Sequence, residues 1–301
     1  MTDVSLFRSA LAQRAQAVEA FLDSAITPNT VAGETVRPER LVAAMRHGVL
    51  NGGKRLRPFL VMECNALLGG VDDAALAIAA AVECVHCYSL IHDDLPAMDD
   101  DDLRRGVPTV HVAFDEATAI LAGDALLTLS FDLAGRRPAG LCVEKANALV
   151  VALARAAGLG GMAGGQMLDL QHEHGAVDPA MVETIHAMKT GALIRFSCEA
   201  GAIVARPDAR ETMRRLGAIL GLAFQLADDL LDVTADAAAM GKATGKDAAA
   251  GKQTLVGLHG VDWARQRLDA LVSEADALLA PFGDKAETLR QAAHFIAHRG
   301  Y

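Results

Sequence analysis

The sequence contains few aromatic residues and few segments with the composition of a β-strand. Aromatic side chains make up 4% of its 301 residues, although apolar residues as a class make up 52%. Runs rich in valine, isoleucine, tyrosine and phenylalanine, which are typical of strands, are scarce, and alanine and leucine dominate instead. The composition therefore predicts a sizeable core that is built from helices.

Positive charge is also in short supply. The chain has 28 lysine and arginine residues against 38 aspartate and glutamate residues, which gives a formal net charge of −10 at pH 7. Because nucleic-acid binding needs a basic surface, we expect no nucleic-acid partner. The acidity is informative beyond this only because the aspartates are unevenly distributed along the chain.

Long uncharged segments are missing as well. The longest stretches without a charged residue, 156–168 and 216–227, are shorter than the roughly 18 apolar residues that a membrane-spanning helix needs. The first residues include Asp3, Arg8 and Glu19 and lack the apolar centre of a secretory signal. We therefore expect no membrane span and a cytoplasmic location.

Cysteine is sparse, and its positions form no regular pattern. The number of cysteines is odd, and although Cys84 and Cys87 form a C-x-x-C pair, no second pair completes a zinc site. We expect reduced thiols in the core of a cytoplasmic protein. The five residues are Cys64, Cys84, Cys87, Cys142 and Cys198.

Helical patterns separated by short breaks run along the chain. Prolines and glycines mark the breaks, as Pro96 does after the long apolar run that begins at Asp72. No change of composition marks a linker, so we expect one domain, residues 1–301, of the all-α class. The glycine-rich residues 158–165 and the mixed residues 234–254 are the least regular. Helices are predicted at 5–25, 38–50, 57–68, 72–95, 111–133, 141–157, 179–204, 208–233 and 261–279.

The first of two aspartate clusters follows a strongly apolar helical pattern. Carboxylates at the end of a buried helix need compensation, and hard divalent cations provide it. Pro96 breaks the helix, so the chain must form a loop to bring the later aspartates back to the first pair. Taken alone, the cluster is explained more simply as a solvated acidic loop. Its members are Asp93, Asp94, Asp99, Asp100, Asp101 and Asp102.

The second cluster changes this interpretation. Asp228, Asp229 and Asp232 follow an uncharged run, again at the far end of an apolar helical pattern. Asp228 and Asp232 are four residues apart and share one helical face. Two such clusters predict facing groups of carboxylates. Magnesium suits them, because it takes one or two carboxylates and completes its octahedron with water and substrate phosphate.

Basic residues stand next to both acidic clusters. The turn Gly52-Gly53 precedes Lys54, Arg55 and Arg57, which are three cations in four residues and suit a diphosphate. Singly, each cation is most often an ordinary surface charge, and only the placement beside aspartates points to a site. The other candidates are Arg104, Arg105, Lys189 with Thr190, and Lys242, Lys246 and Lys252.

Three segments together resemble the trans-isoprenyl diphosphate synthases, in particular the short-chain bacterial farnesyl type. They are Gly52–Pro58 (GGKRLRP), Tyr88–Gly106 (YSLIHDDLPAMDDDDLRRG) and Phe224–Asp232 (FQLADDLLD). The second is similar to the longer form of the family's first aspartate motif, and the segments follow the family's order. The resemblance implies an all-α bundle of about ten or more helices around a deep central cavity, usually a homodimer. It also implies magnesium-dependent head-to-tail condensation of isopentenyl diphosphate with dimethylallyl and geranyl diphosphates to (2E,6E)-farnesyl diphosphate.

The resemblance also implies roles for single residues. His86 shares a helical face with Asp93 two turns later, which fits its implied contact with diphosphate. The spacing around Lys242 is slightly longer than the commonest family pattern, so the positions of Lys246 and Lys252 are assigned less firmly. The metal ligands are Asp93, Asp99 and Asp228, supported by Asp94, Asp229 and Asp232. Isopentenyl diphosphate is held by Lys54, Arg57, His86 and Arg105, and the allylic diphosphate by Arg104, Lys189, Thr190, Gln225, Lys242 and Lys252.

Product length is expected to depend on the residues below the first aspartate cluster. Tyr88 stands five residues before Asp93, about 7.5 Å along a helix. An aromatic residue here, combined with the longer motif, resembles the C15-forming bacterial enzymes. A helical wheel instead places Ser89 directly under Asp93, so the floor of the cavity is assigned to Tyr88 by resemblance alone.

Parts of the sequence also fit other functions. Glu83/His86 and Glu183/His186 fit the Glu-x-x-His motif of di-iron helical bundles, which also need two further inward glutamates. Terpene cyclases share the first aspartate motif but not the second or the Gly-Gly-Lys-Arg turn. A non-catalytic partner subunit would have lost one cluster. The nearest alternative is a geranylgeranyl or geranyl diphosphate synthase of the same family.

Overall fold

A computed structural model describes residues 5–136, 141–172, 178–238 and 254–298, and side chains 235–238 lie outside this description. These residues are almost entirely helical, which confirms the all-α prediction. The α-helices are α1 (Ser5–Ala25), α2 (Glu39–Leu50), α3 (Leu56–Leu67), α4 (Asp72–Asp93), α5 (Val110–Ala113), α6 (Glu116–Gly135), α7 (Val143–Ala157), α8 (Met162–Gln171), α9 (Pro179–Lys189), α10 (Gly191–Ala205), α11 (Arg210–Ala238), α13 (Leu255–His259), α14 (Val261–Leu279) and α15 (Glu287–Ala297). Two 3-10 helices, η1 (Pro207–Ala209) and η2 (Ala280–Ala286), and a hairpin of β1 (Leu103–Arg104) and β2 (Val107–Pro108) complete the elements.

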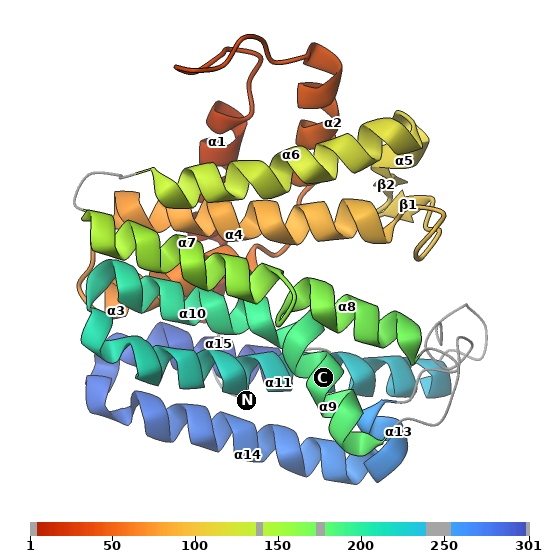
Figure 1. Cartoon of the computed structure of the whole chain (residues 1–301). Helices are drawn as coiled ribbons and strands as arrows, with labels where there is room; N and C mark the ends of the chain where they lie inside the picture. The colour runs from red at the N-terminus through yellow and green to blue at the C-terminus, as the bar shows by residue number, and fades with distance from the viewer. Residues whose placement is uncertain (1–4, 137–140, 173–177, 239–253, 299–301) are drawn as a thin grey trace.

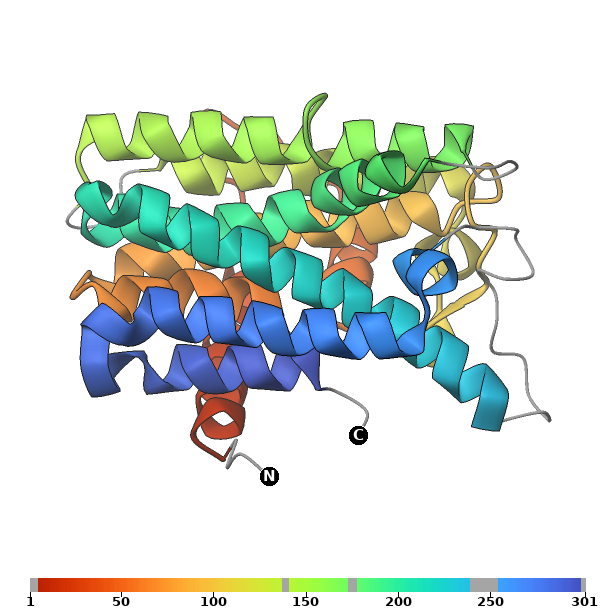
Figure 2. The ribbon, with the colours of Figure 1, turned by 90° about the horizontal axis from the view of Figure 1, so that it is seen from below.

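The long helices lie side by side in a layered bundle, with α4 in its interior (Figure 1). α4 packs against α1, α2, α3, α6 and α10. It is buried on nearly all sides, because its sequence is apolar around the whole circumference instead of along one stripe. The C-terminal ends of α4 and α11 lie at the same end of the bundle as the hairpin, in both views (Figure 2). Both aspartate clusters are therefore carried to one end.

Two hydrophobic clusters fill the interior, and α3 and α10 contribute to both. Val61 and Phe196 belong to the cluster around α4, whereas Phe59 and Cys198 belong to the cluster around α11, α14 and α15. Neighbouring residues of α3, and of α10, thus face different clusters, and these two helices lie between them. The single domain stays a prediction.

Two predicted helices are divided in the structure. The helix expected at 111–133 is interrupted at Phe114, and Asp115 then caps α6 by accepting a hydrogen bond from the backbone N–H of Thr118 at 2.7 Å. An aspartate at this position favours a helix start over continuation of the preceding helix. The helix expected at 179–204 is broken at Thr190, between α9 and α10.

The glycine-rich residues 158–165 are more regular than expected. α8 begins at Met162 and includes Gly165, where an added Cβ would lie 2.3 Å from the backbone nitrogen of Lys189. The glycine therefore serves close packing of α8 on α9, and no propensity scale would place it inside a helix. Also missed were α13, α15 and the hairpin.

The expectation that all five cysteines are buried is corrected. Cys142 is exposed, whereas the other four cysteines are buried free thiols as expected. Three segments are long and apolar enough to cross a membrane by length and composition, namely Asp72–Asp93, Glu116–Gly135 and Val143–Gln171. The charge-free criterion missed them, because an apolar window of 18 residues in each can include up to two charged residues. In the fold, 72% of the most apolar window of Asp72–Asp93 is buried, as its place in the core requires.

Glycines allow α10 and α11 to approach very closely. An added Cβ at Gly217 would lie 2.6 Å from the Cα of Arg195, and one at Gly221 would lie 2.9 Å from the Cα of Gly191. These contacts involve backbone, so they cannot be relieved by a side-chain rotation. The close crossing brings Thr190 and Gln225, on opposite sides of it, within hydrogen-bonding distance.

We predict that Gly217→Ala lowers the free energy of unfolding by about 1–3 kcal/mol, because the new methyl group forces the two helices apart. Urea denaturation with a fitted midpoint and slope measures the change. Gly135→Ala is the matched control, since the nearest neighbour of its Cβ is the Cγ2 of Val150 at 3.8 Å. Equal stability of the two variants would contradict the close crossing.

Candidate active site

The first acidic cluster begins at the last residue of α4. The loop after it folds back, and the backbone N–H of Asp99 donates to the carbonyl of Asp93 at 2.8 Å. Burial raises the pKa of Asp93 to about 6; the charge of Asp99 adds to the rise, and Lys189 opposes it. The fold thus brings Asp99 back to Asp93, as the loop after Pro96 predicted, and it also places the charge of Lys189 near Asp93.

Asp94, by contrast, faces an arginine. It is only 3% exposed, and Arg104 on β1 donates through Nε to both of its carboxylate oxygens, at 2.7 and 2.9 Å. Burial raises the pKa of Asp94, although the hydrogen bonds from Arg104 oppose this. Asp94 and Arg104 therefore fix the acidic loop to the hairpin. The metal-supporting role of Asp94 and the diphosphate-binding role of Arg104 stay predictions.

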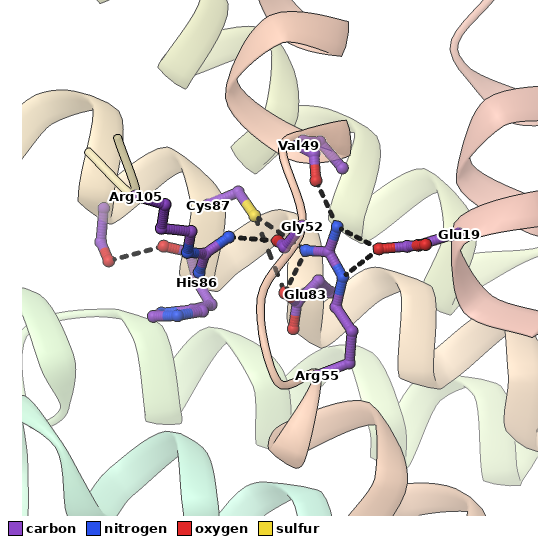
Figure 3. A network of polar contacts seen from close by, with 9 residues as sticks. Glu19, Val49, Gly52, Arg55, Glu83, His86, Cys87 and Arg105 are labelled. Atoms are coloured by element: carbon purple, nitrogen blue, oxygen red, sulfur yellow. Dashed lines mark hydrogen bonds and ion pairs between the residues drawn. The ribbon is translucent and has the colours of Figure 1, made fainter. Parts of the chain in front are cut away.

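The hairpin itself was not predicted, although it positions a predicted residue. Leu103 pairs with Pro108 and Arg104 with Val107, so Arg105 and Gly106 form a two-residue turn. Both have positive φ, 54° and 80°, as a type I′ turn requires. The turn directs Arg105 to the Gly52-Gly53 turn, where its guanidinium donates to the carbonyl of Gly52 (Figure 3).

The four residues predicted to hold isopentenyl diphosphate line one cavity of about 470 Å³. We call this the cationic pocket; its lining includes Lys54, Arg57, His86 and Arg105, and also Arg55 and Glu83. Burial, followed by the positive charges of Arg57 and Arg105, lowers the pKa of His86 well below its usual value. The Nε of Arg57 is buried without a hydrogen-bond partner. A buried, unsatisfied donor among cations fits an anionic ligand.

Apart from Gly53, Arg55 and Glu83, the rest of the pocket wall is apolar and comes from distant parts of the chain. These residues could not be found from the sequence motifs, because α15, which supplies two of them, showed no functional signature. Their contribution is a hydrophobic surface beside the cations. They are Leu11, Leu56, Phe224, Phe295 and Ile296.

Arg55 corrects the expectation that the turn presents three cations. Its guanidinium is fully buried and forms an ion pair with Glu83, itself 2% exposed, at 2.6 Å. Further donations reach the carbonyl of Val49 at 2.5 Å and the carboxylate of Glu19 at 3.2 Å (Figure 3). Only Lys54 and Arg57 of the three remain for a ligand.

The second acidic cluster is divided by burial. Asp228 is half-buried and Asp232 is exposed, whereas Asp229 is 2% exposed. Gln225 donates through Nε2 to Asp229 at 2.9 Å and accepts from the hydroxyl of Thr190 at 2.9 Å. The structure thus joins Thr190, Gln225 and Asp229 in one hydrogen-bonded chain.

Two further residues lie near this chain: His186, which the sequence pointed out only as part of a Glu-x-x-His motif, and Asp169, which it did not point out. His186 Nε2 lies 4.0 Å from the second carboxylate oxygen of Asp229, and Asp169 on α8 forms an ion pair with Lys189 at 2.6 Å. Gln166, one turn before Asp169, has a buried Oε1 without a hydrogen-bond partner. The spacing Gln166-x-x-Asp169 on one helical face is a signal in the sequence, but no helix is predicted between 157 and 179.

Comparison with known proteins places these features in a family. The model of the polyprenyl synthetase family matches residues 38–280. The chain belongs to this family. It is 45% identical over 266 residues to the farnesyl diphosphate synthase of Escherichia coli (strain K12), covering 86% of this chain and 89% of that protein. It is 42% identical to a chloroplastic geranylgeranyl pyrophosphate synthase of Catharanthus roseus, covering 87% of this chain and 74% of that protein.

A solved structure agrees with the fold over its whole length. The apo crystal structure of an FPP/GFPP synthase from Zymomonas mobilis superposes with a TM-score of 0.86 at 40% identity, covering 98% of this chain and 100% of that one. Membership of the polyprenyl synthetase family confirms the predicted resemblance and gives the di-iron alternative no support. In this family member Glu83, half of one Glu-x-x-His motif, is the ion-pair partner of Arg55.

Tyr88 and Ser89 lie on α4 below the first cluster. Tyr88 is half-buried, and its ring contacts His92 edge-on with centroids 5.7 Å apart. Burial and the charge of Asp93 raise its pKa. Ser89 donates to the carbonyl of His86 at 2.9 Å, so its hydroxyl is used within the helix. The role of either residue in product length stays a prediction.

The described part of the chain contains no group of three or more His, Cys, Asp or Glu side chains close enough to hold a metal ion by itself. Magnesium needs no such cage, because water and phosphate supply most of its ligands. Asp93, with its burial-raised pKa beside the second carboxylate of Asp99, is the kind of donor that a cation stabilises. The predicted sites Lys242 and Lys252, with Lys246, lie outside the described residues.

We predict opposite effects of Asp93→Asn on stability and activity. At pH 7, above a pKa of about 6, the folded protein carries a carboxylate that burial disfavours. Without magnesium, the amide should therefore raise the free energy of unfolding, by up to about 3 kcal/mol, while turnover with magnesium falls roughly 100-fold. Denaturation in the presence of a chelator measures the free energy of unfolding, and steady-state kinetics measure the turnover. Asp102→Asn, at an exposed position of the same loop, should change neither, and a less stable Asp93→Asn would contradict the argument.

Proposed function

We propose that this protein is a farnesyl diphosphate synthase, a prenyltransferase of the isoprenoid pathway. It condenses isopentenyl diphosphate with dimethylallyl diphosphate and then with geranyl diphosphate, head to tail, to give (2E,6E)-farnesyl diphosphate and diphosphate. One observation carries the proposal: Lys54, Arg57, His86 and Arg105 converge on one cavity, and α4, which supplies His86, ends in the first aspartate cluster. Relatives named farnesyl diphosphate synthase, 40–45% identical, support the product.

In the proposed mechanism the two diphosphates occupy separate cationic sites. Lys189, Thr190 and Gln225 bind the allylic diphosphate and orient its C–O bond for ionisation. Magnesium bound at Asp93, Asp99 and Asp228 would neutralise negative charge that develops on the leaving diphosphate. Lys189 is already anchored through Asp169, so its ammonium group is positioned before substrate binds.

The cationic pocket holds the second substrate. Lys54, Arg57 and Arg105 bind the diphosphate of isopentenyl diphosphate, and neutral His86 donates or accepts a hydrogen bond without adding charge. The apolar wall formed by Leu56, Phe224 and Phe295 excludes water, which would otherwise quench the allylic cation to an alcohol. The carbon–carbon bond then forms, and the departed diphosphate takes the proton that is lost.

Incubation of the protein with isopentenyl and dimethylallyl diphosphates and Mg²⁺, followed by chromatographic sizing of the products, tests the proposal. We expect a C15 product as the main species, formed only when the metal is present. No condensation would contradict the enzyme, and a C20 main product would favour the geranylgeranyl alternative, for which the relative from Catharanthus roseus gives a precedent.

We predict that Tyr88→Ala shifts the product distribution from C15 toward C20 and longer chains. The half-buried ring occupies space below Asp93 that a growing prenyl chain would otherwise enter. Ser89→Ala is the matched control, because it removes one hydroxyl from the adjacent position and should leave product length unchanged. If Tyr88→Ala leaves product length unchanged, or if only Ser89→Ala changes it, Tyr88 does not form the floor of the cavity.

We further infer a homodimer. α6 and α7 carry exposed apolar residues on their outer faces, among them Leu121 at 57% exposure, Ile120 and Val143. Such a face is suited to burial against a second copy. Sedimentation velocity at micromolar concentration should give twice the mass of the chain, and a monomer would refute this inference. The cytoplasmic location stays a prediction.

A further inference from the structure

Arg55 stands in sequence next to the cations of the pocket, but its own guanidinium is buried and bound by protein groups. Lys54 precedes it, and α3, which carries Arg57, begins directly after it at Leu56. The guanidinium is directed inward to Val49, Glu19 and Glu83 (Figure 3). Three elements, α1, α2 and α4, thus hold one side chain of the turn.

The backbone at Arg55 is unusual as well. With φ 50° and ψ 37° it lies in the left-handed region, which a non-glycine residue adopts only when its surroundings impose it. Its carbonyl accepts from Phe59 at 3.0 Å and so starts α3. This left-handed residue sets the direction of Lys54 relative to α3 and therefore relative to Arg57.

Glu83 links the buried guanidinium of Arg55 to α4, which supplies His86 to the pocket. It lies three residues before His86 on α4, so the two side chains are neighbours on one helical face. It borders the cavity together with Arg57 and His86. The negative charge of Glu83 also faces both Arg55 and Arg57, which reduces the repulsion between the buried guanidinium group of Arg55 and the half-buried Arg57.

We propose that Arg55, through its buried ion pair with Glu83 and its bond to the Val49 carbonyl, is a positioning residue for isopentenyl diphosphate. It fixes Lys54 and Arg57 against His86, so it controls the affinity of the cationic pocket while the allylic site is left unchanged. This inference rests on the proposed function, since it names the substrate of that pocket.

Three variants test it: Arg55→Lys, Arg55→Met and the double variant Arg55→Met/Glu83→Met. The first keeps a charge for Glu83 but cannot reach three acceptors at once. The second leaves Glu83 buried and unpaired. The third replaces the whole pair by apolar side chains, which commonly restores stability, but it does not restore the bond to Val49.

Two sets of measurements separate the two sites. Calorimetric titration with isopentenyl diphosphate alone gives its Kd. Steady-state kinetics give the KM of isopentenyl and of geranyl diphosphate, and slow hydrolysis of geranyl diphosphate without the second substrate reports ionisation. We expect Kd and KM for isopentenyl diphosphate to rise roughly 10–100-fold in all three variants, because small displacements of binding groups are costly. The KM of geranyl diphosphate and its hydrolysis should stay within about twofold.

The double variant decides between positioning and mere stability. We expect its Tm to return to that of the unmodified protein while its Kd for isopentenyl diphosphate stays raised. Recovery of both, or equal rises in the KM of both substrates, would overturn the proposal. If Arg55→Met does not fold, the other two variants still give the answer.

Arg14→Met is the matched control. Arg14 forms an ion pair with Glu63 at 2.8 Å between α1 and α3, outside the cationic pocket. Its loss should lower Tm and leave the Kd and both KM values unchanged. Absence of condensation by the unmodified protein would refute the proposed function instead; titration with inorganic diphosphate would then still test whether Arg55 and Glu83 set the affinity of the pocket.

Discussion

The burial of charge at one end of an apolar bundle is the constraint on which the site depends. α4 is apolar on all sides and packs within the core, so the polar groups on its last turns are withdrawn from water. Buried charges then need partners from other elements. Glu83 of α4 pairs with Arg55, which directly precedes α3, and Asp94, the residue after α4, pairs with Arg104 of β1. Lys189 of α9 pairs with Asp169 of α8.

Of these pairs, Arg55–Glu83 is buried on both sides. Removing one member of such a pair typically costs about 3–5 kcal/mol, although the intact pair is often no better than an apolar replacement. Their retention is explained by position: each pair fixes a residue or loop that carries a candidate substrate group. Asp93 differs, because its pKa of about 6 shows a carboxylate whose protein neighbours compensate it incompletely. That is the electrostatic condition in which a cation gains most by binding.

Close helix packing transmits this arrangement to the second cluster. Gly191, Gly217 and Gly221 let α10 and α11 meet at backbone distance, and the chain from Thr190 through Gln225 to Asp229 spans the crossing. The geometry of the allylic site therefore depends on residues without functional groups. A methyl group added at the crossing would disturb polar contacts two turns away.

The sequence by itself determined the helical class and the positions of most long helices, because periodicity and residue type are local properties. Its resemblance to a known family singled out Lys54, Arg57, His86 and Arg105, which line one cavity. The sequence also brought Asp99 back to Asp93, since Pro96 must end the helix. Tertiary structure decided what is not local: that Arg55 faces inward while Lys54 and Arg57 do not, that Asp94 binds Arg104, and that Asp169 and His186 join the site. The sequence shows that a residue is charged but not where its side chain points. Only the packed helices around it decide whether it meets water, a ligand or an opposite charge.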